Sequence, residues 1–515
     1  MRSTDSPQIA HNDDADSSLS SQADVSRLLP SLEESRQFAR ARKEGESGAG
    51  TALPNSAGEA ALAAGQSAGQ TKDQTIAEAG QKDSGEGKAA SAKSSGKDGK
   101  DAPAQACPVS VEYNALIEKS WRNIYDPTAM GDLASLKNKY NCQIKSPADA
   151  FRFVNQEMGK LEDPYSRVLN PQQVRQQDKL IKGAGKGIGI EVVAVDPERA
   201  KETGSLKVIE VIPGSSAAKK GVLKGDYISE VDGVDLTTKS PAEAFSLIQS
   251  EKTHNITVLR NGERKHLTLE QTAVDVPAVV DRVIPGTNIA YIRIRDFMQE
   301  DESYELQNAI KRHPYVDGFV FDVRGNIGGS VNQALQSASM VVGGGTLLTT
   351  KMRHEDDNPR GPAQYDNTDY TLQQYELVTR TVMPNGRVTE QRDLRLADLV
   401  DKPAVVLVNG DTASAAEIFA AALQQNGEAT LVGTKTFGKG IGQTIFYDQP
   451  AGSRLQVTNF RFFTPNGDWI GDAGKVRHGI RPDREVENGK FAEPETSTDL
   501  QFQAAIAEIN KKLGR

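Results

Sequence analysis

Ser414 is the residue whose place in the sequence most favours chemistry. The apolar run Ala404–Val408 predicts a buried strand, a polar turn follows it, and from Ser414 the pattern is helical until Asn426-Gly427. At a helix N-terminus the first backbone N–H groups lack partners within the helix and the helix dipole is positive. A developing oxyanion is stabilised at such a place, so Ser414 is a candidate nucleophile. The alternative is a serine that only caps the helix.

A nucleophilic serine needs a base, and the segment after the helix offers one. A short strand, Thr430–Val432, precedes a glycine-rich turn that carries Lys435 and Lys439, and Gln443 follows four residues later. A lysine accepts a proton only when it is neutral, and a dry pocket lowers its pKa from about 10.4. The uncharged amide of Gln443 can orient a lysine amine without stabilising the ammonium as a carboxylate would.

These residues together resemble the C-terminal (tail-specific) processing proteases of serine-peptidase family S41. The shared pattern is S-A-x-E-I at Ser414, 25 residues from the serine to the lysine, and then F-G-K-G-x-x-Q. The resemblance implies that Ser414 is the nucleophile, Lys439 the general base and Gln443 the residue that orients it. Thr412 stands where the family usually has a serine, and it keeps a hydroxyl.

Two other polar residues are weighed against this assignment. Lys435 has the wrong spacing for the base and is interpreted as a solvated charge in the loop. A Ser–His–Asp triad is the rival arrangement, but the six histidines include none in a motif near Ser414, and His478 is the nearest conceivable candidate.

A second loop matches the same family. Residues 324–329 resemble its D-x-R-x-N-x-G-G stretch, with Ile327 in place of the usual proline. The backbone N–H groups of Gly328 and Gly329 are expected to join that of Ala415 in an oxyanion hole. The alternatives are a plain turn or a phosphate loop, but no Lys-Ser/Thr follows the glycines as a P-loop requires.

Residues 183–272 resemble a PDZ domain. The carboxylate-binding loop corresponds to Gly187, Ile188, Gly189 and Ile190, and five further glycine-containing or capping elements follow in the usual order. Consecutive N–H groups in such a turn bind a carboxylate, and the peptide adds a strand to the sheet edge. We expect the isoleucines to share one face and to favour apolar C-terminal residues.

The rest of the chain is divided by composition. Residues 1–105 are rich in Ser, Ala, Gly, Asp and Lys and predict disorder, with a marginal helix near Ser31–Arg42. Residues 107–180 predict a helical domain for packing or dimerisation, and Leu161–Ser166 resembles the family's L-x-D-P-Y-[ST] element. The protease core is expected over 273–490, with a polar insertion at about 352–400, and a helix over 491–515. In the insertion we expect a loop at Arg353–Asn367 and a hairpin at Tyr375–Arg387.

Charge, hydropathy and cysteine content argue against several classes of partner and site. The net charge of −9 and the lack of Lys/Arg runs with interleaved aromatics argue against nucleic acid as a partner. No apolar run reaches the roughly 18 residues of a membrane helix, and no apolar stretch of a signal peptide is visible near Met1. The two cysteines, Cys107 and Cys142, exclude a thiolate metal cluster. They are predicted to form a disulfide if the protein is exported, with free thiols as the alternative.

The resemblance covers about residues 110–485 and implies an α/β and α+β multidomain protein. It would have a helical N-terminal region, a PDZ domain and a crotonase-like ββα protease core. The implied activity is a serine endopeptidase that binds apolar free C-termini of proteins and cuts upstream, with no metal and no cofactor. The family resemblance favours a periplasmic or extracellular site, although a cytoplasmic one stays open. The alternatives are a PDZ-bearing scaffold on an inactive protease fold and a crotonase-like acyl-CoA enzyme.

Overall fold

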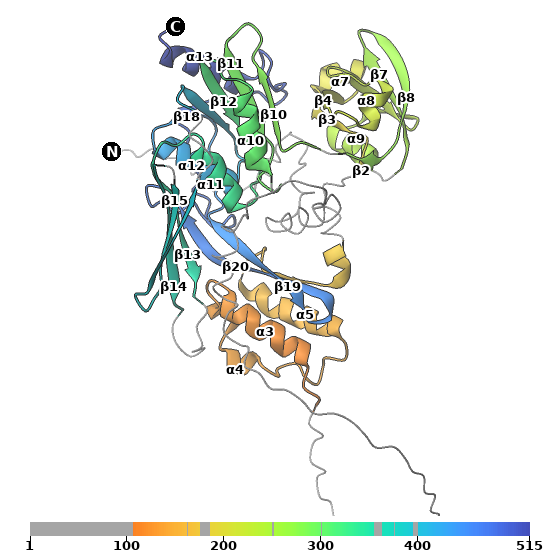
Figure 1. Ribbon diagram of the computed structural model, residues 1–515. Helices are drawn as coiled ribbons and strands as arrows, with labels where there is room; N and C mark the ends of the chain where they lie inside the picture. Colours follow the sequence, from red (N-terminus) through yellow and green to blue (C-terminus); the bar gives the residue numbers. More distant parts are fainter. Residues whose placement is uncertain are drawn as a thin grey trace, which may run out of the picture.

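The computed structural model describes residues 107–515 except 162, 176–185, 250–251, 275, 300, 355–362, 375 and 395–399. The expected disorder and the marginal helix near residues 31–42 lie outside this part. The described chain has a helical region, a PDZ domain and a core of two sheets with their helices, as Figure 1 shows. Within the described residues, no helix is both long and apolar enough to cross a membrane.

Two helices of the helical region begin at serine caps. Ser110 caps its first helix, and Ser146 caps the third, which has a proline in its first turn. Its elements are α3 (Val111–Asn123), η2 (Thr128–Met130), α4 (Leu133–Leu136), α5 (Pro147–Met158), η3 (Gly159–Leu161) and β1 (Arg167–Leu169).

This region is not a separate domain, because it shares its hydrophobic core with the protease. Leu455 and Val457 of β20 (Ser453–Phe463) pack among the apolar side chains of α3 and α5. The short strand β1 also pairs antiparallel with β20. In Figure 1 the helices lie against the ends of β19 and β20. The helical region is therefore fixed to a strand of the core.

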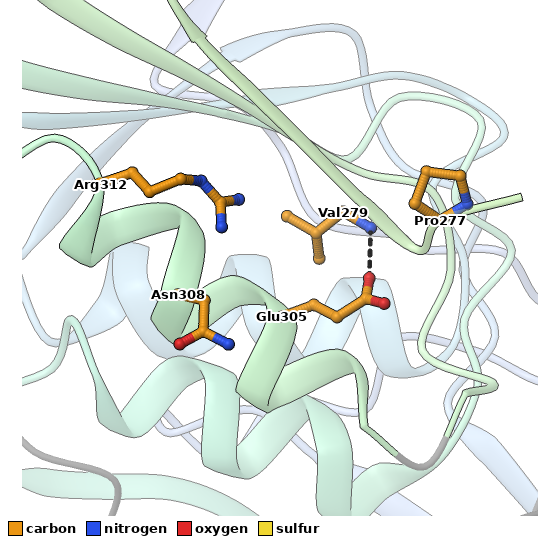
Figure 2. Close-up of a pocket in the computed structure, with 5 residues that line it drawn as sticks. All are labelled: Pro277, Val279, Glu305, Asn308 and Arg312. Carbon is orange, nitrogen blue, oxygen red and sulfur yellow. Dashed lines mark hydrogen bonds between the residues drawn. The ribbon is translucent and has the colours of Figure 1, made fainter. Parts of the chain in front are cut away.

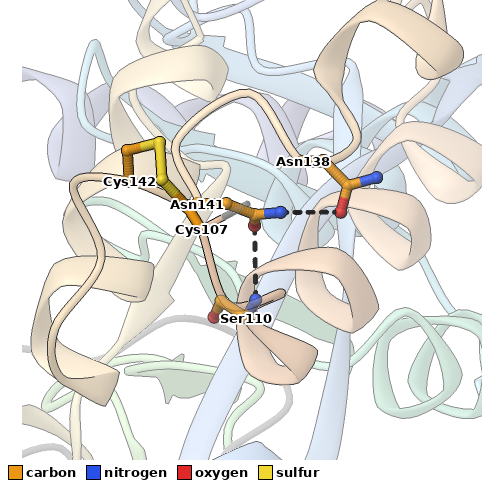
Figure 3. The surroundings of a disulfide bond; sticks show 5 residues. All are labelled: Cys107, Ser110, Asn138, Asn141 and Cys142. Carbon is orange, nitrogen blue, oxygen red and sulfur yellow. Dashed lines mark hydrogen bonds between the residues drawn. A yellow bond between two sulfur atoms is a disulfide. The ribbon is translucent and has the colours of Figure 1, made fainter. Parts of the chain in front are cut away.

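A disulfide between Cys107 and Cys142 closes the start of the helical region, with 5.0 Å between the two Cα atoms. Beside it, the amide of Ser110 donates to Asn141 Oδ1 and the Asn141 side chain donates to Asn138, as Figure 3 shows. The predicted pairing of the two cysteines is thus present in the structure.

The PDZ domain is built on a six-stranded antiparallel sheet in the order β3-β4-β5-β7-β8, with β6 beside β5. Ser240 and Glu243 form a capping box at the start of α9. Its elements are β2 (Lys186–Gly187), β3 (Ile190–Ala194), α7 (Pro197–Thr203), β4 (Leu206–Val211), α8 (Ser216–Lys220), β5 (Tyr227–Val231), β6 (Val234–Asp235), η4 (Leu236–Thr238), α9 (Pro241–Ile248), β7 (His254–Arg260), β8 (Glu263–Leu269) and β9 (Thr272–Ala273).

Charged groups join the PDZ domain to the core. Glu191 pairs with Arg293 and with Arg295, each at 2.7 Å, and Glu210 pairs with Arg295 at 2.5 Å. Burial alone would raise the pKa of Glu191, but the two guanidinium groups hold it down to about 2. Lys207 also pairs with Glu493 at 2.6 Å, so both sides of the contact carry ions of each sign.

The core contains a six-stranded sheet in the order β10-β11-β12-β17-β18-β21, parallel from β11 onward. Alternate residues of its strands point to opposite faces and build two separate apolar clusters. Helices α10, α11 and α12 cover one face and α13 covers the other. The elements are β10 (Val279–Val283), β11 (Ile289–Ile294), α10 (Glu302–Lys311), β12 (Gly318–Asp322), α11 (Val331–Ser339), β17 (Ala404–Val408), α12 (Ala415–Gln425), β18 (Ala429–Gly433), β21 (Arg484–Glu485) and α13 (Leu500–Lys512).

The second sheet of the core corrects the expectation for 352–400. A loop was expected over Arg353–Asn367, but β13 continues to Arg353 and β14 already begins at Tyr365, while residues 355–362 lie outside the described part of the chain. The hairpin runs from Glu376 to Leu394, past the expected end at Arg387. Frequent threonine and valine give these polar segments strand propensity that a search for apolar runs overlooks. The elements are β13 (Gly345–Arg353), β14 (Tyr365–Gln373), β15 (Glu376–Val382), β16 (Val388–Leu394), β19 (Ile441–Gln449), η5 (Pro450–Gly452) and β20, in the sheet order β1-β20-β13-β14-β15-β16 with β19 beside β20.

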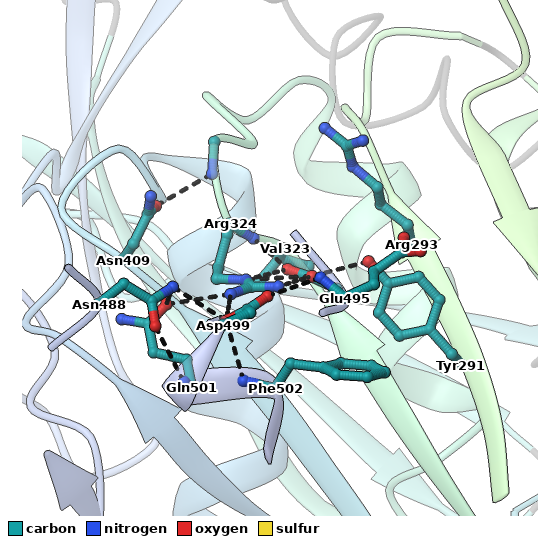
Figure 4. A network of polar contacts seen from close by, with 12 residues as sticks. Tyr291, Arg293, Val323, Arg324, Asn409, Asn488, Glu495, Asp499, Gln501 and Phe502 are labelled. Atoms are coloured by element: carbon teal, nitrogen blue, oxygen red, sulfur yellow. Dashed lines mark hydrogen bonds and ion pairs between the residues drawn. The ribbon is translucent and has the colours of Figure 1, made fainter. Parts of the chain in front are cut away.

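The C-terminal helix is shorter than expected, since α13 starts at Leu500 and not at 491. Pro494 disfavours a helix before it, and Asp499 caps the helix by accepting the amide of Phe502 at 3.1 Å. The same carboxylate pairs with Arg324 at 2.8 Å, as Figure 4 shows. Arg324 in turn pairs with Asp322 at the end of β12, so the C-terminal helix is anchored to the loop that follows this strand.

Candidate active site

The predicted nucleophile, base and oxyanion glycines all follow neighbouring parallel strands. Gly328 and Gly329 follow β12, Ser414 follows β17, and Lys439 follows β18. These strands are paired in that order, so their carboxyl ends lie at one edge of the sheet. Ligand and catalytic groups gather at this edge in open α/β sheets. The topology therefore brings together residues that are up to 111 positions apart in sequence.

Ser414 occupies the turn between β17 and α12 in a strained backbone conformation, with φ 56° and ψ −119°. Its side chain is buried at 4% exposure. The backbone makes the capping contacts: the Ser414 amide donates to Glu417 Oε2 at 2.9 Å, and the Glu417 amide donates back to the Ser414 carbonyl at 2.9 Å. Thr412 is buried and donates to the Val323 carbonyl at 2.9 Å, which ties this turn to the loop after β12.

The loop after β12 packs directly on Ser414. A Cβ on Gly328 would lie 2.8 Å from Ser414 Cβ and 2.9 Å from the Ala415 nitrogen, so only glycine fits here. The N–H of Gly328 donates to Asn326 Oδ1 at 2.9 Å. Among the described residues the N–H groups of Gly329 and Ala415 have no acceptor, which leaves them free to bind a ligand oxygen.

Asn326 holds this loop in place, a role that its position in the sequence motif did not reveal. It is fully buried, and its side chain donates to the Ile294 carbonyl at 3.0 Å while accepting from Gly328. Its own carbonyl accepts the amide of Ala413 at 2.9 Å. The loop after β12 and the serine turn are thus held together through one asparagine.

Lys439 is buried at 8% exposure at the end of the glycine-rich turn. Burial lowers the pKa of Lys439 to about 8, although the negative charges of Asp163 and Glu417 raise it. The amine lies over the ring of Tyr165, with Nζ 4.3 Å from the ring centroid. Within the described part of the chain, no hydrogen bond joins this amine to the Ser414 hydroxyl.

Gln443 lies beside an irregularity in the β19–β20 pairing. Gly442 pairs with Phe460 but Gln443 pairs with Thr458, so a bulge lies between them. Gln443 Nε2 donates to Thr458 Oγ1 at 3.1 Å. Its buried Oε1 has no hydrogen-bond partner among the described residues and remains available as an acceptor. The bulge has no clear signal in the sequence.

Glu417 is a further buried group of the site. Its carboxylate is fully buried and accepts from the Thr436 hydroxyl and from the amides of Ser414, Gly438 and Lys439. Burial raises the pKa of Glu417, while these four donors lower it. A glutamate three residues after a helix cap predicts the contact with Ser414. The contacts with residues 436–439 depend on tertiary structure.

The two residues weighed as alternatives, Lys435 and His478, differ from Ser414 and Lys439 in their exposure to solvent. Lys435 and His478 are both exposed, which fits solvated side chains. The cavity in Figure 2, of about 230 Å³, is lined by Pro277, Val279 and residues of α10. None of its lining residues belongs to the site around Ser414.

The loop of the PDZ domain differs in one respect from the expectation. Gly189 has φ 83°, so the backbone turns there and the two isoleucines do not simply alternate along a strand. Ile188 is buried in the domain core, and Ile190 packs partly against it. The amides of Ile188 and Gly189 have no acceptor among the described residues, as a carboxylate-binding turn requires.

Comparison with known proteins agrees with the fold and identifies the family. Residues 288–486 match peptidase family S41, and residues 207–260 match a PDZ domain. A carboxyl-terminal-processing protease of Synechocystis sp. is 30% identical over 414 residues, covering 77% of this chain and 86% of the relative. A carboxy-terminal-processing protease of Bartonella bacilliformis is 32% identical over 338 residues, covering 63% and 67%. Among solved structures, a photosystem II D1 C-terminal processing protease has 23% identity and a TM-score of 0.45, covering 77% of this chain and 99% of that one.

Proposed function

Because the chain belongs to peptidase family S41, the family of C-terminal processing serine proteases with a PDZ domain, we propose that it cleaves proteins with a Ser414–Lys439 dyad. The observation that carries this proposal is the shared edge of three parallel strands. It gathers a strained serine, a buried lysine and two amides that lack an acceptor among the described residues.

In the proposed reaction, neutral Lys439 accepts the proton of Ser414 as its Oγ attacks the carbonyl carbon of the scissile peptide bond. The N–H groups of Gly329 and Ala415 stabilise the resulting oxyanion. The Lys439 ammonium then gives its proton to the leaving amine as the C–N bond breaks, which leaves an acyl-enzyme. Water attacks this ester and gives a proton to Lys439, which passes it to Ser414 Oγ as the ester C–O bond breaks and the peptide acid leaves. Gln443 Oε1 accepts from the amine and directs its lone pair toward the serine.

We also propose that the PDZ domain binds the free C-terminus of the substrate. Two features support this: the unpaired amides of Ile188 and Gly189, and the free edge of β3, where a peptide strand can add. The disulfide further favours an oxidising compartment outside the cytoplasm.

Dye-labelled casein, an unstructured protein, provides the test. Ser414→Ala and Lys439→Ala should each abolish cleavage, and Lys439→Arg should be equally inactive because arginine cannot be deprotonated. Gln443→Ala should be slower but active, since this residue orients the base. Lys435→Ala is the matched control, an exposed lysine of the same loop, and should cleave normally.

A scaffold on an inactive fold predicts instead that the wild-type protein is as inert as Ser414→Ala. Substantial turnover by Lys439→Arg would contradict the lysine as base. Sequencing protein C-termini in cells with wild-type protein or Ser414→Ala would then identify the physiological substrates.

A further inference from the structure

One turn of the helical region reaches the proposed base from outside the protease core. We infer that the turn 163–166 positions the base: it holds the Gln443 amide through Thr458 and places Asp163 and the Tyr165 ring against Lys439. This rests on the proposed dyad and deepens it. The residues concerned are positioning residues, since the turn contacts Thr458 and Lys439 rather than substrate.

The first contact runs from Asp163 to Gln443 through defined hydrogen bonds. The Ser166 hydroxyl donates to Asp163 Oδ2 at 2.5 Å and accepts the amide of Thr458 at 2.9 Å. Because Asp163 takes the hydroxyl hydrogen, the Ser166 oxygen is directed at β20. Thr458 is thereby fixed next to the bulge, where its Oγ1 accepts Gln443 Nε2 at 3.1 Å. With Nε2 bound to Thr458, the Oε1 of this amide has no hydrogen-bond partner among the described residues.

The second contact is between Tyr165 and Lys439. The amide of Tyr165 donates to Asp163 Oδ1 at 2.9 Å, which sets the path of the turn. The ring then lies 4.3 Å from Lys439 Nζ. An aromatic face and a nearby carboxylate both favour an ammonium.

The charge of Asp163 and the ring of Tyr165 oppose the lowering of the Lys439 pKa by burial. A lysine that is only desolvated becomes a weak acceptor of the serine proton, whereas a base works best with a pKa near the working pH. The other charged groups that face this region are Glu417 on α12 and Asp472 and Arg477, which lie beside Lys439 and Tyr165. Of the groups around Lys439, Asp163 and Tyr165 are the ones that belong to the helical region.

The pH dependence of kcat/KM on dye-labelled casein tests this contact, since its acid limb reports the base of the free enzyme. Asp163→Asn removes a charge and Tyr165→Leu removes the aromatic face while keeping an apolar cover. Each should move the acid limb to lower pH, by about half a unit or more. Tyr165→Phe keeps the ring and should leave the limb in place. Asp132→Asn, at the exposed cap of α4, is the matched control for net charge and should not move it.

A double-mutant cycle tests the link to Gln443. Thr458→Val should lower kcat about tenfold with little change in KM, and it should have no further effect in a Gln443→Ala background. Thr444→Val is the matched control: it also removes a buried hydroxyl contact between β19 and β20, to Asn459, and should retain activity.

A purely structural role for the turn predicts slower cleavage with an unmoved acid limb, and additive effects of Thr458→Val and Gln443→Ala. Either result would overturn the inference. If Asp163→Asn does not fold, Tyr165→Leu and the cycle decide. Failure of the dyad itself is distinguishable, because Lys439→Ala would then remain active.

Discussion

The backbone amides of Ser414 and Lys439 donate to the same atom, Glu417 Oε2, at 2.9 and 2.8 Å. The residue that carries the proposed nucleophile and the residue that carries the proposed base are thus held by one buried carboxylate. Their separation therefore depends on α12, on which Glu417 lies, and not only on the turn between β18 and β19.

Glu417→Gln should strongly reduce activity and stability. The carboxylate offers only acceptors to four donors, whereas an amide brings N–H groups against at least one backbone N–H. An unsatisfied buried donor costs about 1–3 kcal/mol. Urea unfolding and casein cleavage would measure both effects. Glu428→Gln is the control, since this glutamate accepts only the exposed amide of Gly343 at 3.0 Å. A Glu417→Gln enzyme with normal kcat would show that this carboxylate is dispensable.

Lys439→Met should make the protein more stable at neutral pH while abolishing cleavage. The folded pKa of about 8 lies below the unfolded value of 10.5, so at pH 7 the fold holds a buried ammonium at a cost of about 3 kcal/mol. Between pH 8 and 10.5 the unfolded chain binds more protons than the folded one, so wild-type stability rises with pH. The advantage of the Met variant should therefore be full at pH 7 and vanish near pH 10.5. Urea unfolding at several pH values measures this, and a pH-independent difference would contradict the lowered pKa.

The sequence predicted the elements that local patterns determine. The apolar run of β17, the glycine stop after α12 and the caps at Ser146 and Ser240 all lie where propensity and capping rules place them. The order of the domains followed from motifs that resemble known families. The assignment of Ser414, Lys439 and Gln443 came from the same source and stays a prediction.

Other features depended on contacts between distant segments. The bulge that turns Gln443 toward Thr458 follows from pairing between β19 and β20, and local sequence does not encode that register. The contact of Tyr165 with Lys439 joins residues 274 positions apart. The boundary of the helical region was missed for the same reason, since Leu455 and Val457 complete its core from a strand of the protease.

Removal of the disulfide should weaken the helical region. Cys107 and Cys142 are 35 residues apart, and the chain-entropy model gives about 4 kcal/mol for a loop of this size. Cys107→Ala/Cys142→Ala should lower the free energy of unfolding by about that amount. Urea unfolding, monitored by the fluorescence of Trp121 in α3, measures this loss.

The intact mass of protein from its native compartment, measured with and without reductant, should differ by about two daltons, because reduction adds two hydrogens. An unchanged mass would mean that the cysteines are free there.

Asp499→Asn should loosen the C-terminal helix from the loop after β12. It removes one of the two carboxylates that pair with Arg324, at a cost of about 2–3 kcal/mol. Burial would raise the pKa of Asp499, but Arg324 lowers it below its usual value. The difference in free energy of unfolding between the wild type and Asp499→Asn should thus be full above pH 5. It should decline as pH falls below about 4, because the carboxylate is then protonated.

Asp317→Asn is the control for this network, since it breaks an exposed pair with Arg515 and should cost under about 1 kcal/mol. Equal losses from the two variants would show that burial of the Arg324 pair contributes nothing.

Amidation of a substrate's C-terminus tests the proposed role of the PDZ domain. The amides of Ile188 and Gly189 can donate to a carboxylate, and charge-assisted hydrogen bonds are worth about 1.5–3 kcal/mol each. An amidated peptide lacks the charge, so its kcat/KM should fall about tenfold or more relative to the free acid. At saturating concentration both peptides should be cut at similar rates, because the proposed chemistry at Ser414 does not involve the carboxylate. Equal cleavage of the two peptides at low concentration would mean that the domain does not bind free C-termini.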